Sequence, residues 1–103
     1  MNVILTNRAK AFFAKGTYEP SAKTFIVKAG ATVSKDIAYS PTFRGSKAIE
    51  KLRAQYVVDG ITQEDIIFKS PSTAANFVTG RSSNGLILWR TEDGTLLKDA
   101  ISD

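Results

Sequence analysis

The sequence predicts a small α+β domain, and three observations lead to that fold class. The chain has 103 residues, close to the commonest length of one domain and enough to bury one hydrophobic core. Segments with strand-like alternation and segments with helical spacing follow one another in the order β-β-α-β-α-β-β. Because strands and helices do not alternate regularly, we expect a mostly antiparallel sheet packed with two helices. No repeat or linker divides residues 1–103, so a single domain is expected.

The first part of the chain is expected to form an antiparallel hairpin beside a short edge strand. Residues 3–5 are the edge strand, and residues 9–18 and 23–29 alternate as paired strands do. Pro20 marks the turn between them, because proline fixes φ and lacks a backbone donor. A hairpin needs one buried face, which places these aromatic residues in the core: Phe12, Phe13, Phe25 and Phe43.

The middle of the chain predicts a helix followed by a short strand. Residues 46–58 carry apolar side chains at helical spacing, with Ser46 as the N-cap and Gly60 just beyond the C-terminal end. Residues 66–68 are a short apolar run and are expected to form a strand.

A second helix is expected directly after that strand. Ser70 can cap it, and Pro71 occupies the first helical position, where proline is favoured. Ala74 and Ala75 are small enough to let the helix approach a sheet closely, and Gly80 ends it.

The last part of the chain is expected to return to strand structure. Asn84 and Gly85 form a turn into a strand at residues 86–90, which is apolar on both faces and therefore central. Trp89 in that strand is expected in the core. A further turn leads to a final strand at residues 95–97.

The composition removes most catalytic chemistry. The chain has no cysteine and no histidine, so it lacks thiolates and the usual general base and metal ligand. Its closest carboxylate pairs, Glu64-Asp65 and Glu92-Asp93, do not have the spacing of a calcium loop. We therefore expect no catalytic residues, no metal and no cofactor, and we expect that the protein is not an enzyme. An enzyme would need a pocket built from Asp, Glu, Lys, Ser or Tyr.

The chain also lacks the signals of export or membrane insertion. No apolar run approaches the roughly 20 residues of a membrane span, and the N-terminus does not read as a signal peptide. A cytoplasmic location without membrane contact is expected.

The charge is unevenly distributed along the sequence. Residues 1–58 hold ten Lys and Arg and three acids, whereas residues 59–103 hold four Lys and Arg and seven acids. A basic face could attract phosphates or an acidic partner, although an ordinary solvated surface explains the same pattern. The candidate nucleic-acid-binding residues are Arg81, Ser82, Ser83, Asn84, Ser70, Ser72, Lys69, Arg44, Lys47, Lys51 and Arg53.

Two of these groups have a local structural alternative. Ser70 and Ser72 could present a helix N-terminus to a phosphate, or simply cap the helix. The polar loop at residues 81–84 could offer donors to phosphates or base edges, or serve only as a turn.

The stretch from residue 70 to residue 89 resembles a known signature. Its residues are Ser70-Pro71-Ser72, Ala74-Ala75, Gly80, Asn84-Gly85 and Trp89. The pattern is similar to the bacterial domain of unknown function 4357, often found C-terminal to GIY-YIG nuclease domains, and to the related restriction-adenine-methylation-associated domain. Similarity to the first family also covers residues 23–35 and 58–60, so that it extends over about residues 9–97. Leu86 departs from the pattern, because the family often has an aromatic residue there.

The resemblance implies an accessory role, and the lack of cysteine and histidine favours one without catalysis. The second family is associated with DNA recognition, which favours nucleic-acid (DNA) binding in a restriction, modification or nuclease context. A nuclease or methyltransferase protein is then the expected partner beside DNA. The alternative is a protein-interaction or structural module that makes no contact with nucleic acid.

Overall fold

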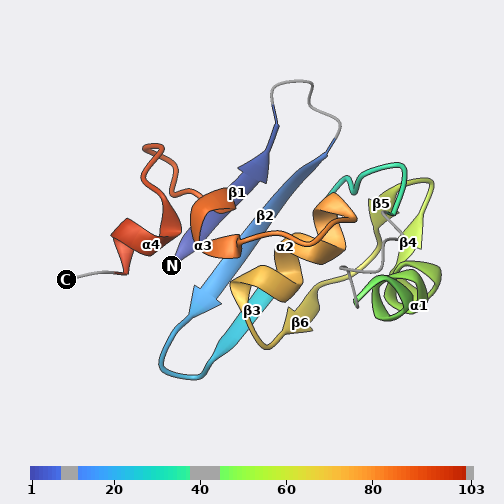
Figure 1. The fold of residues 1–103 in the computed structure, drawn as a ribbon, viewed down its shortest axis with the longest axis horizontal. Helices are drawn as coiled ribbons and strands as arrows, with labels where there is room; N and C mark the ends of the chain where they lie inside the picture. Colours follow the sequence, from blue (N-terminus) through green and yellow to red (C-terminus); the bar gives the residue numbers. More distant parts are fainter. Residues whose placement is uncertain (8–11, 38–44, 102–103) are drawn as a thin grey trace.

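The structure is a computed structural model that describes residues 1–7, 12–37 and 45–101. Its elements follow the order βββ-α-βββ-ααα (Figure 1). They are β1 (Asn2–Thr6), β2 (Phe13–Glu19), β3 (Thr24–Val27), α1 (Ser46–Tyr56), β4 (Val57–Val58), β5 (Ile61–Thr62), β6 (Ile66–Phe68), α2 (Pro71–Thr79), α3 (Gly85–Leu88) and α4 (Leu97–Ala100). The antiparallel pairing and the segregated helices confirm the α+β class.

The main sheet has four antiparallel strands in the order β1-β2-β3-β6. The predicted hairpin is confirmed as β2 and β3, the predicted edge strand as β1, and the strand at residues 66–68 as β6. Residues 9–11 of the first hairpin strand lie outside the described residues.

Helix α2 crosses one face of this sheet and closes the core (Figure 1). The core side chains are Val3, Leu5, Ala14, Phe25, Val27, Ala31, Val33, Ile66, Phe68, Ala74, Ala75, Phe77, Val78, Trp89 and Leu97. Residues on the opposite sheet face alternate with these and are more exposed, as the period of a half-buried strand requires.

The aromatic residues divide between the two faces. Phe25 is fully buried and Phe12 packs partly against the core, as expected. Phe13 was predicted to be buried, but 41% of it is exposed, because Ala14 and Gly16 take the inward positions of β2. Phe43 lies outside the described residues.

The first helix ends two residues earlier than the sequence predicts. Its N-cap is Gly45 rather than Ser46, and no side chain caps it. After Tyr56 the chain forms β4, which pairs with β5. Asp59 and Gly60 have positive φ, so Gly60 belongs to the tight turn of this hairpin and does not end the helix.

The end of the chain differs most from the prediction. The strand expected at residues 86–90 is instead the short helix α3. The strand expected at 95–97 is reduced to an isolated bridge at Leu96, and Leu97 begins the helix α4. Strand pairing here is limited to Arg90, which forms isolated bridges with Ile4 and Leu96. Trp89 is fully buried as predicted, but it lies at the end of a helical turn. The structure thus has four helices among its described residues, not two.

Candidate nucleic-acid interface

The serine hydroxyls at the start of α2 are engaged within the protein. Ser70 is the N-cap, and its Oγ accepts a hydrogen bond from the Thr73 amide at 3.2 Å. The Oγ of Ser72 accepts from the Gly85 amide at 3.0 Å. The structure therefore places both serines in bonds that shape the fold, as the capping interpretation expects.

Close approach between α2 and α3 depends on Gly85. A Cβ at this position would overlap the backbone of Pro71 and Ser72. The same contact brings the indole of Trp89 under the helix start, where Nε1 donates to the Pro71 carbonyl at 3.0 Å. Glycine is therefore needed here for space, since its φ is not in the left-handed region.

The loop at residues 81–84 is held from within by hydrogen bonds. The Ser83 amide donates to Oδ1 of Asn76 at 2.8 Å, and the Ser83 and Thr79 hydroxyls lie 2.9 Å apart. Asn84 caps α3, because its Oδ1 accepts from the Leu86 amide at 3.0 Å. Ser83 and Asn84 thus have internal partners, and they fix the loop's conformation.

Two cations at or beside this loop have no partner in the part of the chain that the structure describes. Arg81, Ser82 and Lys35 are exposed, and their side chains make no hydrogen bond or ion pair with the described residues. They line one open hollow of about 520 Å³, together with Ser83, Thr79 and the acidic Asp36. The hollow exists because the Ser34 amide donates to the Val78 carbonyl at 2.8 Å, which holds residues 34–36 beside the end of α2.

Lys35 was not among the predicted site residues. Lys35 ends the family-like stretch 23–35, but that resemblance does not connect it with Arg81, which lies far along the chain. Only the packing of residues 34–36 against α2 brings the two cations together.

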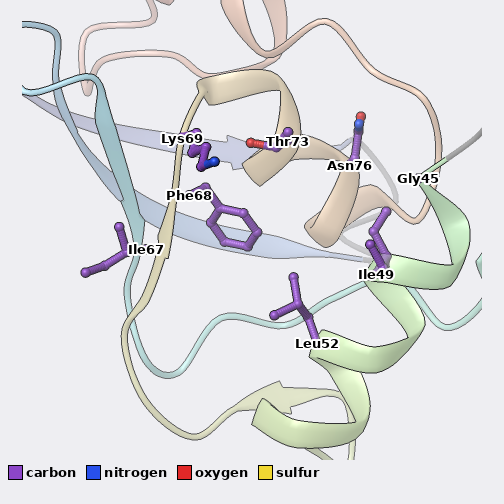
Figure 2. A pocket seen from close by; sticks show the side chains of 9 residues that line it. Gly45, Ile49, Leu52, Ile67, Phe68, Lys69, Thr73 and Asn76 are labelled. Carbon is purple, nitrogen blue, oxygen red and sulfur yellow. The ribbon is translucent and has the colours of Figure 1, made fainter.

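Three predicted lysines lie away from this hollow. Lys47 and Lys51 are exposed and one turn apart on α1. Lys69 lines a different pocket, a largely apolar groove between β6 and α1 shown in Figure 2. Arg44 lies outside the described residues. The predicted residues therefore divide between two regions of the molecule.

The Arg53 side chain connects α1 to the end of α2 through hydrogen bonds. Its guanidinium donates to the carbonyls of Phe77 at 2.7 Å and Ser34 at 2.8 Å, and also to the Ser34 hydroxyl and the Val78 carbonyl. It also lies 5.9 Å from the centre of the Phe77 ring. These contacts satisfy carbonyls at the end of α2, where helix carbonyls lack helical partners.

Two carboxylates titrate below their ordinary range. The Lys28 ammonium, 2.8 Å away, and the Ala29 amide lower the pKa of Asp65. Hydrogen bonds from Thr91 and Thr95 lower the pKa of Asp93. Both groups serve turns and loops on the surface, and neither lines the hollow at Arg81.

The described parts of the chain contain no cluster of three or more acidic side chains placed to hold a metal ion. Within residues 1–7, 12–37 and 45–101, no helix is long and apolar enough to cross a bilayer.

Fold and site together define a small α+β domain in which one helix start, Ser70–Ser72, is locked to a glycine-tryptophan turn. The chain belongs to the family described as a domain of unknown function (DUF4357), whose model matches residues 5–101. This confirms the resemblance to the first of the two families, which was drawn from residues 70–89. Comparison with curated proteins found no match, and neither did comparison with solved structures.

Proposed function

We propose that this domain is a non-catalytic accessory module that binds the phosphate backbone of nucleic acid, most simply duplex DNA. The observation that carries the proposal is that Arg81 and Lys35 line the same open hollow. Each of these side chains is exposed and has no partner among the described residues, so each is available to a phosphate.

The chemistry of the hollow suits a phosphodiester. A guanidinium can form two parallel hydrogen bonds with phosphate oxygens, and the Ser82 hydroxyl beside it offers a further donor. One carboxylate, Asp36, lines the same hollow. With Arg81 and Lys35 there as well, the hollow keeps an excess of positive charge. The chain's net charge of +4 adds a favourable long-range attraction.

The proposal narrows the predicted binding surface. Ser70, Ser72 and Asn84 are used to build α2 and α3, and Arg53 is used to join α1 to α2. Arg81 and Ser82 remain as predicted candidates, with Lys35 added. A restriction, modification or nuclease setting, with a nuclease or methyltransferase protein nearby, is the context that we propose from the family resemblance.

A pair of charge-matched double variants tests the proposal. Binding of a fluorescein-labelled duplex of about 30 base pairs is followed by anisotropy over a range of salt concentrations. Arg81→Gln/Lys35→Gln should weaken binding roughly tenfold at low salt and reduce the salt slope by about 2, because two phosphate contacts are lost.

The control removes the same charges elsewhere. Arg90 and Lys98 are both exposed and do not line the hollow. Arg90→Gln/Lys98→Gln should change affinity by less than about threefold, the residual effect of net charge. Equal weakening in both double variants, or no anisotropy change with the unmodified chain at low salt, would refute the assignment.

A further inference from the structure

Strand β6 has one free edge, and the register of the sheet shows which backbone groups line it. In an antiparallel strand, alternate residues direct their N–H and C=O groups to opposite neighbours. The Lys28 amide donates to the Lys15 carbonyl of β2, so the backbone groups of Lys28 face β2. By alternation, the N–H and C=O groups of Phe25 and Val27 face β6. Phe25 pairs with Phe68 and Val27 with Ile66. The N–H and C=O of Ile67 therefore point away from the sheet.

The neighbouring part of the same edge is already covered. Val58 of β4 pairs with Ile61, and the Gln63 amide donates to the Tyr56 carbonyl at 2.8 Å. The residues before Tyr56 belong to α1 and do not pair with this edge. The next outward position in strand structure is Ile67, whose outward backbone groups have no partner in the described chain.

Among the described residues, the space beside Ile67 is a groove and not a packed contact. It has a volume of about 430 Å³ and lies between β6 and α1, with α2 at one end (Figure 2). Its lining residues are Gly45, Ala48, Ile49, Leu52, Ile67, Phe68, Lys69, Thr73 and Asn76. Apolar side chains dominate this set, while the Ile67 side chain points out of the groove (Figure 2).

The charges around the groove are positive. Lys69 lines it directly, immediately after β6. Lys51 is exposed one turn beyond Ala48 on α1, so it lies on the helix flank next to the groove. These two ammonium groups favour an acidic residue in whatever segment enters.

We propose that this groove binds an extended segment of a partner protein, which adds to the sheet as a strand beside β6. The segment's backbone pairs with the N–H and C=O of Ile67. Its inward side chains are apolar and contact Leu52, Ile49 and Phe68, and an acidic side chain meets Lys69. The proposal concerns a different surface from the nucleic-acid hollow and does not depend on it.

The shape of the groove favours a lone strand over a second copy of this chain. The available edge is bounded by α1 on one side and by α2 at its end (Figure 2). In a second copy, β6 follows β5 closely and runs into α2, so it cannot enter the groove without those elements. Nucleic acid is disfavoured because the lining is mostly apolar.

The test begins with peptides selected from a displayed library of random sequences of about twelve residues, using the full chain as bait. We expect the selected peptides to alternate apolar residues and to carry an acidic residue. Binding to the isotope-labelled chain should shift the amide resonances of Ile67 and Lys69 and slow hydrogen exchange at Ile67.

A backbone variant isolates the strand pairing. Ile67→Pro removes the outward donor without removing a bond to β3, and proline is tolerated on the open side of an edge strand. It should weaken binding of the selected peptides about tenfold, because the segment loses the hydrogen bond from the Ile67 amide and the proline ring crowds the added strand. The control Ile67→Thr keeps the amide and changes only a side chain that is 70% exposed, so affinity should stay within about twofold.

Charge reversal tests the partner's chemistry. Lys69→Glu should lower the affinity of acidic peptides about tenfold and leave their neutral analogues within about twofold. Thermal unfolding of each variant verifies that it folds.

Four results would overturn the proposal. They are a library that yields no peptide, peptides that bind Ile67→Pro as well as the unmodified chain, an Ile67 amide already protected in the free protein, and self-association that Ile67→Pro abolishes. The last would assign the edge to a second copy.

Discussion

At the scale of single residues, the distinctive residues between 70 and 89 mostly meet packing and capping requirements of this fold. Gly85 lets α3 touch the start of α2, Ser72 accepts the Gly85 amide, and Trp89 donates to the Pro71 carbonyl. Gly80 ends α2 with positive φ, and a Cβ there would overlap the Asp36 carbonyl. Each of these residues is explained by a neighbour in the fold, without a ligand.

Replacement of Trp89 tests this interpretation. Trp89→Phe removes the donor to the buried Pro71 carbonyl and part of a fully buried ring that lies 4.5 Å from the Phe25 ring centre. We expect a loss of about 2–4 kcal/mol in the free energy of unfolding. Circular dichroism in urea measures it, since the variant has no tryptophan left to report fluorescence.

The matched control lies on α3, two residues before Trp89. Ile87→Ala truncates a side chain that is 44% exposed and should cost less than about 1 kcal/mol. If Trp89→Phe is as mild as this control, the tryptophan is not the structural anchor that its burial indicates.

At the scale of elements, one side chain joins α1 to the end of α2. Arg53 supplies five hydrogen bonds to the backbone and side chain of residues 34, 77 and 78. Because helix carbonyls at a C-terminus have no helical partner, this guanidinium replaces water at that end. The sequence marked Arg53 only as one of several cations on a helix.

Removal of the guanidinium should weaken this connection. Arg53→Met keeps the length of the side chain but leaves the Phe77 and Ser34 carbonyls without this donor. We expect a loss of about 2–4 kcal/mol in urea unfolding, with Arg53→Lys intermediate because an ammonium cannot fork in the same way. The exposed Lys51→Met should change stability by less than about 0.5 kcal/mol. A similar small effect at both positions would contradict the structural role.

At the scale of the whole molecule, the response to acid follows from a few carboxylates. The chain has no histidine, so no imidazole titrates near neutral pH. The pKa of Asp65 and that of Asp93 are lowered from 3.8 by their hydrogen bonds in the folded state. As the pH falls through 3.8, the unfolded state therefore binds more protons than the folded state. The free energy of unfolding decreases until the pH reaches the lowered pKa values of the folded state.

Urea midpoints at several pH values test this expectation. The midpoint should change little between about pH 8 and pH 5 and then fall below about pH 4. Asp65→Asn/Asp93→Asn should flatten that fall, because the shifted carboxylates are gone. Asp59→Asn is the control, since the Asp59 carboxylate accepts no hydrogen bond within the described chain. An unchanged acid slope in the double variant would contradict the assignment.

The sequence by itself determined the elements that local chemistry specifies. Alternation identified the β2–β3 hairpin, and Ser70, Pro71 and Gly80 identified both ends of α2, because caps and glycine act on their immediate neighbours. The same kind of reasoning failed at residues 86–90. A short apolar run fits a strand or a buried helical turn equally well, and contact between Gly85 and α2 decides for the helix.

Only the tertiary structure decided which distant residues meet. Lys35 and Arg81 share a hollow because the Ser34 amide bonds to the Val78 carbonyl at the end of α2, and no local pattern carries that information. The edge of β6 at Ile67 is open because β4 pairs only with β5. The length of β4 is in turn limited by the end of α1 at Tyr56. Local sequence therefore specifies caps, turns and alternation, whereas the surfaces proposed for binding arise from contacts between segments far apart in the chain.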